Sequence, residues 1–175
     1  MVGLLFLLWG CGSSTPQDID AMSQRDLLVR SSLDLRGVRP TVTEYEAIEN
    51  DPAQLDSLID GFMDDPRFED RVAAMFSEIY LTRTEAYAIN ADSYGGVVTQ
   101  AEFIQSIGQE AVRMVGHVAA NDRPWTDLVQ GNWTMANETL GAIWPVTYPE
   151  NGQGWAVSEY TDGRPGAGIL SLIHI

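Results

Sequence analysis

Large apolar side chains recur at helical spacing through the middle of the chain. They form two consecutive stripes: Leu55, Leu58, Ile59, Phe62 and Met63, then Phe68, Val72, Met75, Phe76 and Ile79. This spacing places each stripe on one face of a helix. Because burying one large apolar side chain contributes roughly 1.5–3 kcal/mol, we expect these two faces to pack against each other.

Capping signals predict where the helices begin and end. Three pairs have capping-box spacing, in which each side chain bonds the backbone of the other residue: Ser23 and Asp26, Thr41 and Glu44, and Thr99 and Glu102. They predict a helix over residues 18–36 that stops at Gly37, a short helix after it, and a later long helix that ends near Ala120. Pro52 and Pro66 each follow an aspartate and predict the starts of a third and a fourth helix.

The remaining pattern favours an all-α fold. Short helices are expected over residues 125–130 and 134–143, and no stretch alternates convincingly with a period of two. We therefore expect an irregular multi-helix array over residues 18–144. Residues 145–170 are rich in proline and glycine and are expected to be the loop-rich start of a following region.

The first residues have the pattern of an exported lipoprotein. Residues 2–9 are apolar apart from glycine, too short to span a bilayer but suited to the core of a signal peptide. Leu8, Gly10 and Cys11 then resemble a lipobox, although Trp9 is bulky and no cationic residue precedes the apolar run. We expect residues 1–10 to be a signal peptide that is cleaved off before Cys11. The Cys11 thiol is then expected to be acylated, and residues 11–17 to form a tether. The alternative is an ordinary buried cysteine.

Acylation of Cys11 predicts where the protein is located, and it makes the membrane its first expected partner. Acyl chains contribute about 0.8 kcal/mol per buried methylene, so two or more of them anchor a protein firmly. The chain is therefore expected in the cell envelope, lipid-anchored to the inner or outer membrane, in the periplasm or at the surface.

Charge and cysteine content narrow the candidate chemistry. There are 25 acidic residues against 10 arginines, and the net charge of −15 repels phosphate backbones, so no nucleic-acid partner is expected. The single cysteine excludes an internal disulfide, a CxxC zinc knuckle and a CxxCH haem attachment within this chain. No cofactor or metal site is expected. His117 is interpreted as a capping or surface residue near a helix end, where a positive charge is favoured.

Two groups of residues are candidates for ligand binding. Arg36 and Arg39 flank Gly37 and could grip a carboxylate or a sulfated sugar; the favoured alternative is a structural fork that bonds helix-end carbonyls or Asp34. Four of the five tryptophans lie in the last third of the chain, namely Trp125, Trp133, Trp144 and Trp155. An aromatic platform of Trp125 and Trp133 could stack on sugar rings, although core packing is the commoner role.

The acidic cluster at the junction of the third and fourth helices suggests two other activities. Its members are Asp60, Asp64, Asp65, Glu69 and Asp70. Paired carboxylates could serve a glycosidase, and carboxylates could bind calcium, but the EF-hand order of acids and its glycine is missing. The favoured interpretation is that Asp65 caps the next helix and the others are solvated or paired with Arg67 and Arg71. No catalytic residue is assigned.

Residues 25–80 resemble a bacterial family of unknown function found in surface proteins of planctomycetes and myxobacteria. The resemblance rests on SSLDLRGVRPTVTEYEAI and DPAQLDSLIDGFMDDPRFEDRVAAMF, and NDRPWTDLVQGNWTMANETL is similar to its companion domain. Such domains often stand beside c-type cytochrome domains, which implies that this chain is the front part of a larger protein. The resemblance carries no catalytic residue onto this sequence.

The end of the chain and the function complete the expectations. The last six residues, LSLIHI, equal a frame translation of a common sequencing adaptor, so residues 171–175 are expected not to be native. The expected function is a non-catalytic structural or interaction module of an exported lipoprotein, with a glycan or protein partner. The alternative is the leading part of a secreted haem-associated or polysaccharide-processing enzyme system.

Overall fold

The computed structural model describes residues 21–82, 89–164 and 166–170. Over these residues the elements follow in the order α1 (Gln24–Arg36), α2 (Val42–Asn50), α3 (Gln54–Met63), α4 (Arg67–Tyr80), η1 (Ala91–Tyr94), α5 (Gln100–Ala120), α6 (Asp127–Gln130), β1 (Trp133–Ala136), α7 (Glu138–Ile143) and β2 (Ala156–Glu159). The fold is therefore mainly helical, as the sequence predicts.

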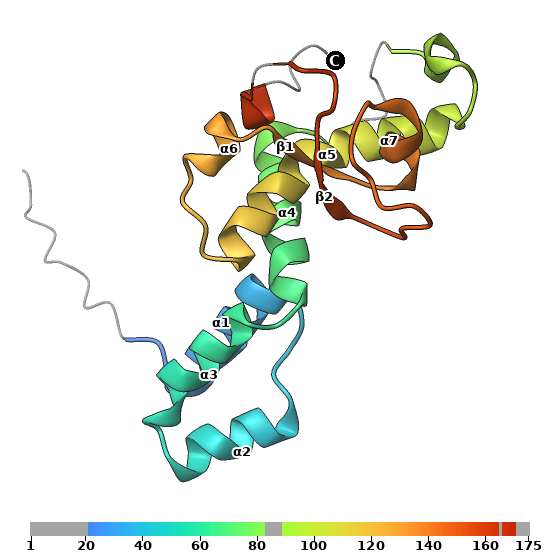
Figure 1. The fold of residues 1–175 in the computed structure, drawn as a ribbon. Helices are drawn as coiled ribbons and strands as arrows, with labels where there is room; N and C mark the ends of the chain where they lie inside the picture. Colours follow the sequence, from blue (N-terminus) through green and yellow to red (C-terminus); the bar gives the residue numbers. More distant parts are fainter. Residues whose placement is uncertain (1–20, 83–88, 165, 171–175) are drawn as a thin grey trace, which may run out of the picture.

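Two groups of elements are joined by α4 and α5. In Figure 1, α1, α2 and α3 lie together in the lower part of the molecule, and α4 runs from them to the upper part. There α4 packs along α5, which also contacts β1, α6 and α7. Gly116 permits the close approach of the two long helices, because a Cβ at this position would lie 2.7 Å from the Glu69 carbonyl oxygen.

Side-chain caps set several helix ends where the sequence predicts them. The Ser23 side chain accepts a bond from the Asp26 amide, and Gly37 ends α1 in the left-handed region with φ of 72°. Complete capping boxes open α2 at Thr41 and α5 at Thr99. The first helix begins at Gln24, later than expected, and α3 begins after Ala53 rather than directly after Asp51.

The purely α-helical expectation is wrong in one feature, a small antiparallel sheet. Strand β1 pairs with β2 so that Trp133 lies opposite Glu159 and Ala136 lies opposite Ala156. All four side chains of β1 are buried, so its sequence shows no alternation of polar and apolar residues. The expected helix over 134–143 consequently starts only after Asn137, which caps α7. The expected boundary at residue 144 falls between the two paired strands.

Three clusters of buried apolar residues stabilise the fold. One joins the first three helices and contains Leu28, Ile48, Leu55 and Phe62. A second, where α4, α5, α6 and β1 meet, contains Val72, Met114, Val115, Val118, Leu128, Trp133 and Met135. The third surrounds the first half of α5 and contains Ala91, Phe103, Ile107, Ala136 and Leu140. The helix faces of α3 and α4 thus enter different clusters instead of packing mainly on each other.

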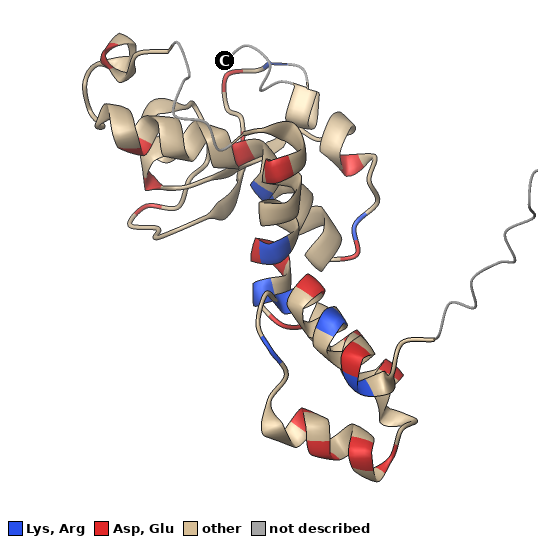
Figure 2. Ribbon diagram, turned by 180° about the vertical axis from the view of Figure 1, so that it is seen from behind, with Lys and Arg blue, Asp and Glu red and all other residues tan. Residues whose placement is uncertain are grey.

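Charged residues are distributed unevenly over the molecule. Figure 2 shows acidic and arginine residues at short intervals along α1 to α4, whereas the part around α5, α7 and the sheet is mostly uncharged. Within the described ranges, no helix has the length and apolar character needed to cross a membrane.

Candidate functional site

A buried carboxylate lies at the centre of the contact between α5 and the sheet. Glu110 is 0% exposed. Its Oε1 accepts hydrogen bonds from the Thr134 hydroxyl at 2.6 Å and the Tyr160 hydroxyl at 3.2 Å, and its Oε2 accepts one from the Trp144 indole at 3.4 Å. These donors come from β1, from the residue after β2 and from the end of α7, so one side chain joins three elements to α5.

Burial governs the protonation of this cluster. Removal from solvent raises the pKa of Glu110 to about 7, against the opposing effect of bonds from Thr134, Trp144 and Tyr160. Burial and the nearby Glu110 charge also raise the pKa of the Tyr160 hydroxyl. Glu110 is thus near the midpoint of its titration at neutral pH, but it has no contact with solvent. We interpret it as a structural group of the fold.

An open polar groove of about 380 Å³ lies on the neighbouring surface of α5. It is bounded by α5, the start of α7 and the residue before β2, elements that lie together in Figure 1. Its lining residues are mostly hydrogen-bonding: Glu102, Gln105, Ser106, Gln109, Arg113, Asn137, Thr139 and Trp155. The volume is within the range of about 300–1,000 Å³ typical of small-ligand sites.

The two charged side chains of the polar groove already have partners. The Glu102 carboxylate accepts bonds from the Thr99 amide and hydroxyl in the α5 cap, which lower its pKa. Arg113 forms an ion pair with Asp70 of α4, and its guanidinium lies 5.7 Å from the centre of the Trp155 ring. The groups left to meet a ligand are therefore mainly neutral.

Amides and hydroxyls supply this neutral chemistry. The Asn137 amide donates to the Ser106 hydroxyl at 2.9 Å, which fixes both side chains at the base of α7. Among the described residues, the Gln105 amide and the Thr139 hydroxyl have no hydrogen-bond partner. The arrangement can bind a polar ligand through neutral hydrogen bonds beside the partly exposed Trp155 ring.

A second, apolar groove of about 390 Å³ lies between α4 and α6. It is lined by Phe76, Tyr80, Val115, Trp125, Leu128, Val129 and Ile169. Trp125 is 55% exposed, and its ring centre lies 6.3 Å from that of Phe76. This groove offers apolar contact and few hydrogen-bonding groups.

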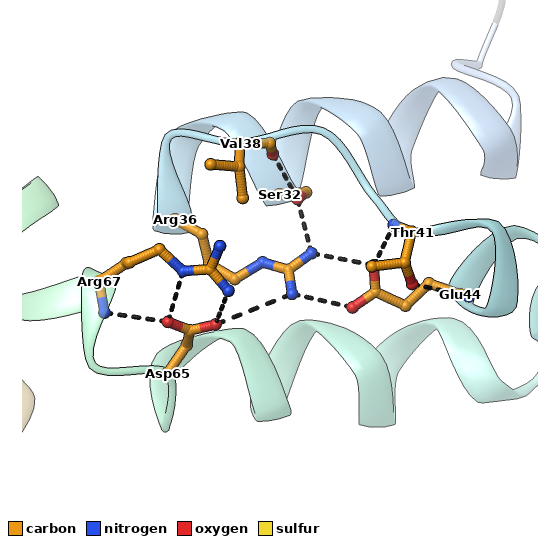
Figure 3. A network of polar contacts seen from close by, with 7 residues as sticks. All are labelled: Ser32, Arg36, Val38, Thr41, Glu44, Asp65 and Arg67. Carbon is orange, nitrogen blue, oxygen red and sulfur yellow. Dashed lines mark hydrogen bonds and ion pairs between the residues drawn. The ribbon is translucent and has the colours of Figure 1, made fainter.

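Arg36, a candidate ligand-binding residue, is buried among the protein's own acids. Its guanidinium bonds Glu44 at 2.8 and 3.1 Å and the Ser32 hydroxyl at 2.7 Å, and lies 3.9 Å from Asp65. Figure 3 shows it between these two carboxylates, with the Arg67 guanidinium on the other side of Asp65. The Arg36 guanidinium also stacks 3.7 Å from the centre of the Phe62 ring.

This network ties the α1–α2 turn to the start of α4. Arg67, through hydrogen bonds and charge, and more weakly Arg36, lower the pKa of Asp65 to about 2. Ser32 in turn donates to the Val38 carbonyl at 2.6 Å. Arg36 is therefore a structural residue whose partners are Glu44, Ser32 and Asp65, and not the helix-end carbonyls or Asp34 named as candidates from the sequence. Arg71, an expected partner of the acidic cluster, donates a hydrogen bond to the backbone carbonyl of Asp34.

Comparison with known proteins assigns a family. Residues 44–146, more than half of the chain, match the model of a family described as "Protein of unknown function (DUF1592)". The chain belongs to the DUF1592 family. No curated protein matches the chain significantly, and neither does any solved structure.

The DUF1592 segment contains most, but not all, of the residues described above. It includes Glu110, Thr134 and Trp144, and the side of the polar groove that α5 and α7 form. Trp155 and Tyr160 follow the matched segment in the sequence, and Arg36 precedes it. The family match therefore covers the helices that position both grooves, while two aromatic residues come from the segment that adds β2.

The other residues singled out from the sequence lie apart from the polar groove. Arg39 is exposed in the turn after α1. Trp133 is 6% exposed and its indole donates to the Asp127 carbonyl, whereas Trp125 is 55% exposed, so only Trp125 of the pair presents its ring to solvent. Cys11 lies outside the described residues.

The surroundings of His117 act against the positive charge that a helix end favours. Its ring is partly buried and packs edge-on to Trp133, with ring centres 5.8 Å apart. Burial lowers the pKa of the imidazole, an effect that Glu69 opposes and Arg123 reinforces. Among the described residues, no group of three histidine, cysteine or acidic side chains could hold a metal ion.

Sequence reasoning missed Glu110 and the polar groove. One signal was present: Glu110 stands on the buried side of α5, three residues after Ile107 and four before Met114. A carboxylate in an apolar stripe needs internal partners. Those partners come from β1, α7 and the residue after β2, which only the tertiary fold brings together.

Proposed function

We propose that this chain is a non-catalytic interaction module held at the bacterial cell envelope by a lipid anchor on Cys11. The observation that carries the proposal is the chemistry of the polar groove, whose lining is mostly neutral amides and hydroxyls together with one indole ring. Such groups recognise a ligand by hydrogen bonds and ring contact. The Ser106 hydroxyl is bonded to an amide rather than to a general base, so it is not activated as a nucleophile.

The bonding of the buried charged residues Glu110 and Arg36 supports a non-catalytic role. Glu110 has the most strongly raised carboxyl pKa described, but its oxygens face three internal donors and no solvent. Arg36 is similarly enclosed by Glu44 and Asp65. Both side chains are enclosed by internal partners, so neither can contact a substrate. The proposed module binds its ligand without a cofactor of its own.

The anchor rests on the sequence around the only cysteine. A lipobox-like Leu8 to Cys11 segment follows an apolar run of signal-peptide length. Acylation of the Cys11 thiol would hold the helical domain at the inner or outer membrane through a short polar tether. We further propose kinship with the planctomycete- and myxobacterial-type surface proteins that carry c-type cytochrome domains, on the strength of the segments in α1 to α4.

Mass spectrometry of the chain produced in a Gram-negative host tests the anchor. The wild-type chain should begin at Cys11 and carry the mass of a diacylglycerol and a further acyl group. Cys11→Ser should remain uncleaved and unacylated. Wild-type protein that retains Met1, or that gains no acyl mass, would contradict the anchored location.

An assay for new reducing ends tests the non-catalytic role. The purified chain should leave neutral oligosaccharides intact over long incubation, as a heat-denatured sample does. Release of reducing ends by the native chain, and not by the denatured control, would show that the module is an enzyme.

A further inference from the structure

The polar groove combines three properties that point to one class of ligand. It has an indole ring at one side, uncharged hydrogen-bonding side chains along its length, and a volume of about 380 Å³ open to solvent. We propose that it is a binding site for a neutral pyranose-based glycan. This inference rests on the proposed function and names the ligand of that site.

Trp155 supplies the surface for the sugar ring. It lies just before β2, is partly exposed, and packs against the two clusters of buried residues on either side of α5. Its position is therefore fixed before a ligand arrives. The C–H face of a pyranose is apolar and contacts an indole well, whereas its hydroxyls need polar neighbours.

The hydroxyl groups of the sugar find those neighbours on α5 and α7. Gln105 and Gln109 stand one helical turn apart on α5. The Gln105 amide can both donate and accept along the groove, while the Gln109 oxygen already accepts a 3.4 Å bond from Arg113 and its amide N–H groups can donate. Thr139 of α7 also lines the groove, and its hydroxyl is unpaired in the described part of the chain. Hydroxyl-rich ligands are recognised by this kind of mixed donor and acceptor set.

Charge selects a neutral glycan over an acidic one. The Arg113 guanidinium is already paired with Asp70, and the Glu102 carboxylate remains ionised in the α5 cap. The chain as a whole carries a net charge of −15, which disfavours the approach of uronic acids or sulfated sugars. The one arginine that lines the groove is therefore already engaged by Asp70, which weakens it as a partner for an anionic substituent.

Calorimetric titration of the full chain with defined oligosaccharides tests this site. The probes are cellohexaose and chitohexaose as neutral glycans and hexagalacturonate as an acidic one. At least one neutral probe should bind with a Kd of about 1 mM or tighter, and hexagalacturonate should bind more weakly. Absence of binding by both neutral probes, or preference for the acidic one, would overturn the proposal.

Matched variants locate the site. Trp155→Ala should weaken binding by about tenfold or more through loss of the ring contact. Gln105→Ala should weaken it by about three- to tenfold, the effect of one neutral hydrogen bond. The controls are Trp125→Ala, an exposed tryptophan outside the polar groove, and Gln54→Ala, an exposed glutamine on α3. Both controls should bind as the wild type does.

Gln105→Ala keeps the test decisive if Trp155→Ala does not fold, because Gln105 is exposed and has no structural bond among the described residues. Unchanged affinity of Gln105→Ala and a loss in Trp125→Ala would overturn the assignment of this groove. Failure of glycan binding by a chain that is acylated on Cys11 removes the ligand class and leaves the anchor intact. Binding followed by cleavage contradicts the non-catalytic function and leaves the ligand class intact.

Discussion

The Thr134 hydroxyl on β1 donates a 2.6 Å hydrogen bond to the Glu110 carboxylate on α5. Both residues are 0% exposed, so this bond joins the sheet to α5 away from the protein surface. Tyr160 adds a second donor to the same oxygen from the end of β2. A buried polar network of this kind specifies how its elements pack, because another strand register would remove the Thr134 and Tyr160 donors from the carboxylate.

Glu110 makes stability depend on pH in an unusual direction. Its pKa rises from 4.5 to about 7 on folding, so the folded chain binds the proton more tightly than the unfolded chain. This contribution is fully present below pH 4.5 and is lost as the pH rises through about 7. The loss is roughly 3 kcal/mol. Urea unfolding of the wild type and Glu110→Gln across this range measures it.

The difference between the two proteins isolates the Glu110 contribution from that of other acids. As the pH rises from 5 to 8, the free energy of unfolding of the wild type should fall by roughly 2 to 3 kcal/mol relative to that of Glu110→Gln. Glu46→Gln, at an exposed position on α2, should give a curve parallel to the wild type. Parallel curves for Glu110→Gln and the wild type would contradict a raised pKa for Glu110 in the folded chain.

Arg36 and Arg39 provide a matched pair of arginines in one turn. Arg36→Ala should lower the free energy of unfolding by about 3 kcal/mol, because it leaves the largely buried Glu44 carboxylate without its cation and removes the stacking on Phe62. Arg39→Ala, at an exposed position, should change it by less than about 0.5 kcal/mol. Chemical denaturation of both variants checks this. Equal losses would mean that the Arg36 network adds nothing to the fold.

Two helical glycines should respond oppositely to the same substitution. Gly116→Ala should destabilise the chain by about 1–3 kcal/mol, because the new Cβ meets the backbone of α4 at Glu69. Gly61→Ala meets nothing within 4 Å on α3 and should stabilise by roughly 0.5–1 kcal/mol. Thermal unfolding of each variant measures the sign. A stable Gly116→Ala would show that α4 and α5 are not held as closely as described.

Local signals predicted the helices well because caps and apolar stripes act over a few residues. Thr41, Gly37 and Thr99 set helix ends as expected. Strand β1 escaped prediction because both of its faces are buried, which removes the alternation that identifies a strand. The polar groove escaped prediction because Gln105 and Trp155 stand fifty positions apart and meet only after β2 pairs with β1.

A two-dimensional NMR titration tests most directly whether the polar groove is a binding site. The full chain, labelled uniformly with the heavy NMR-active isotope of nitrogen, gives one indole N–H resonance for each tryptophan. Trp→Phe variants assign these resonances. Addition of a neutral hexasaccharide should shift the Trp155 resonance in a saturable manner and leave that of Trp125 in place. A Trp155 resonance that stays fixed while the sugar is in large excess, or a shift confined to Trp125, would contradict the account.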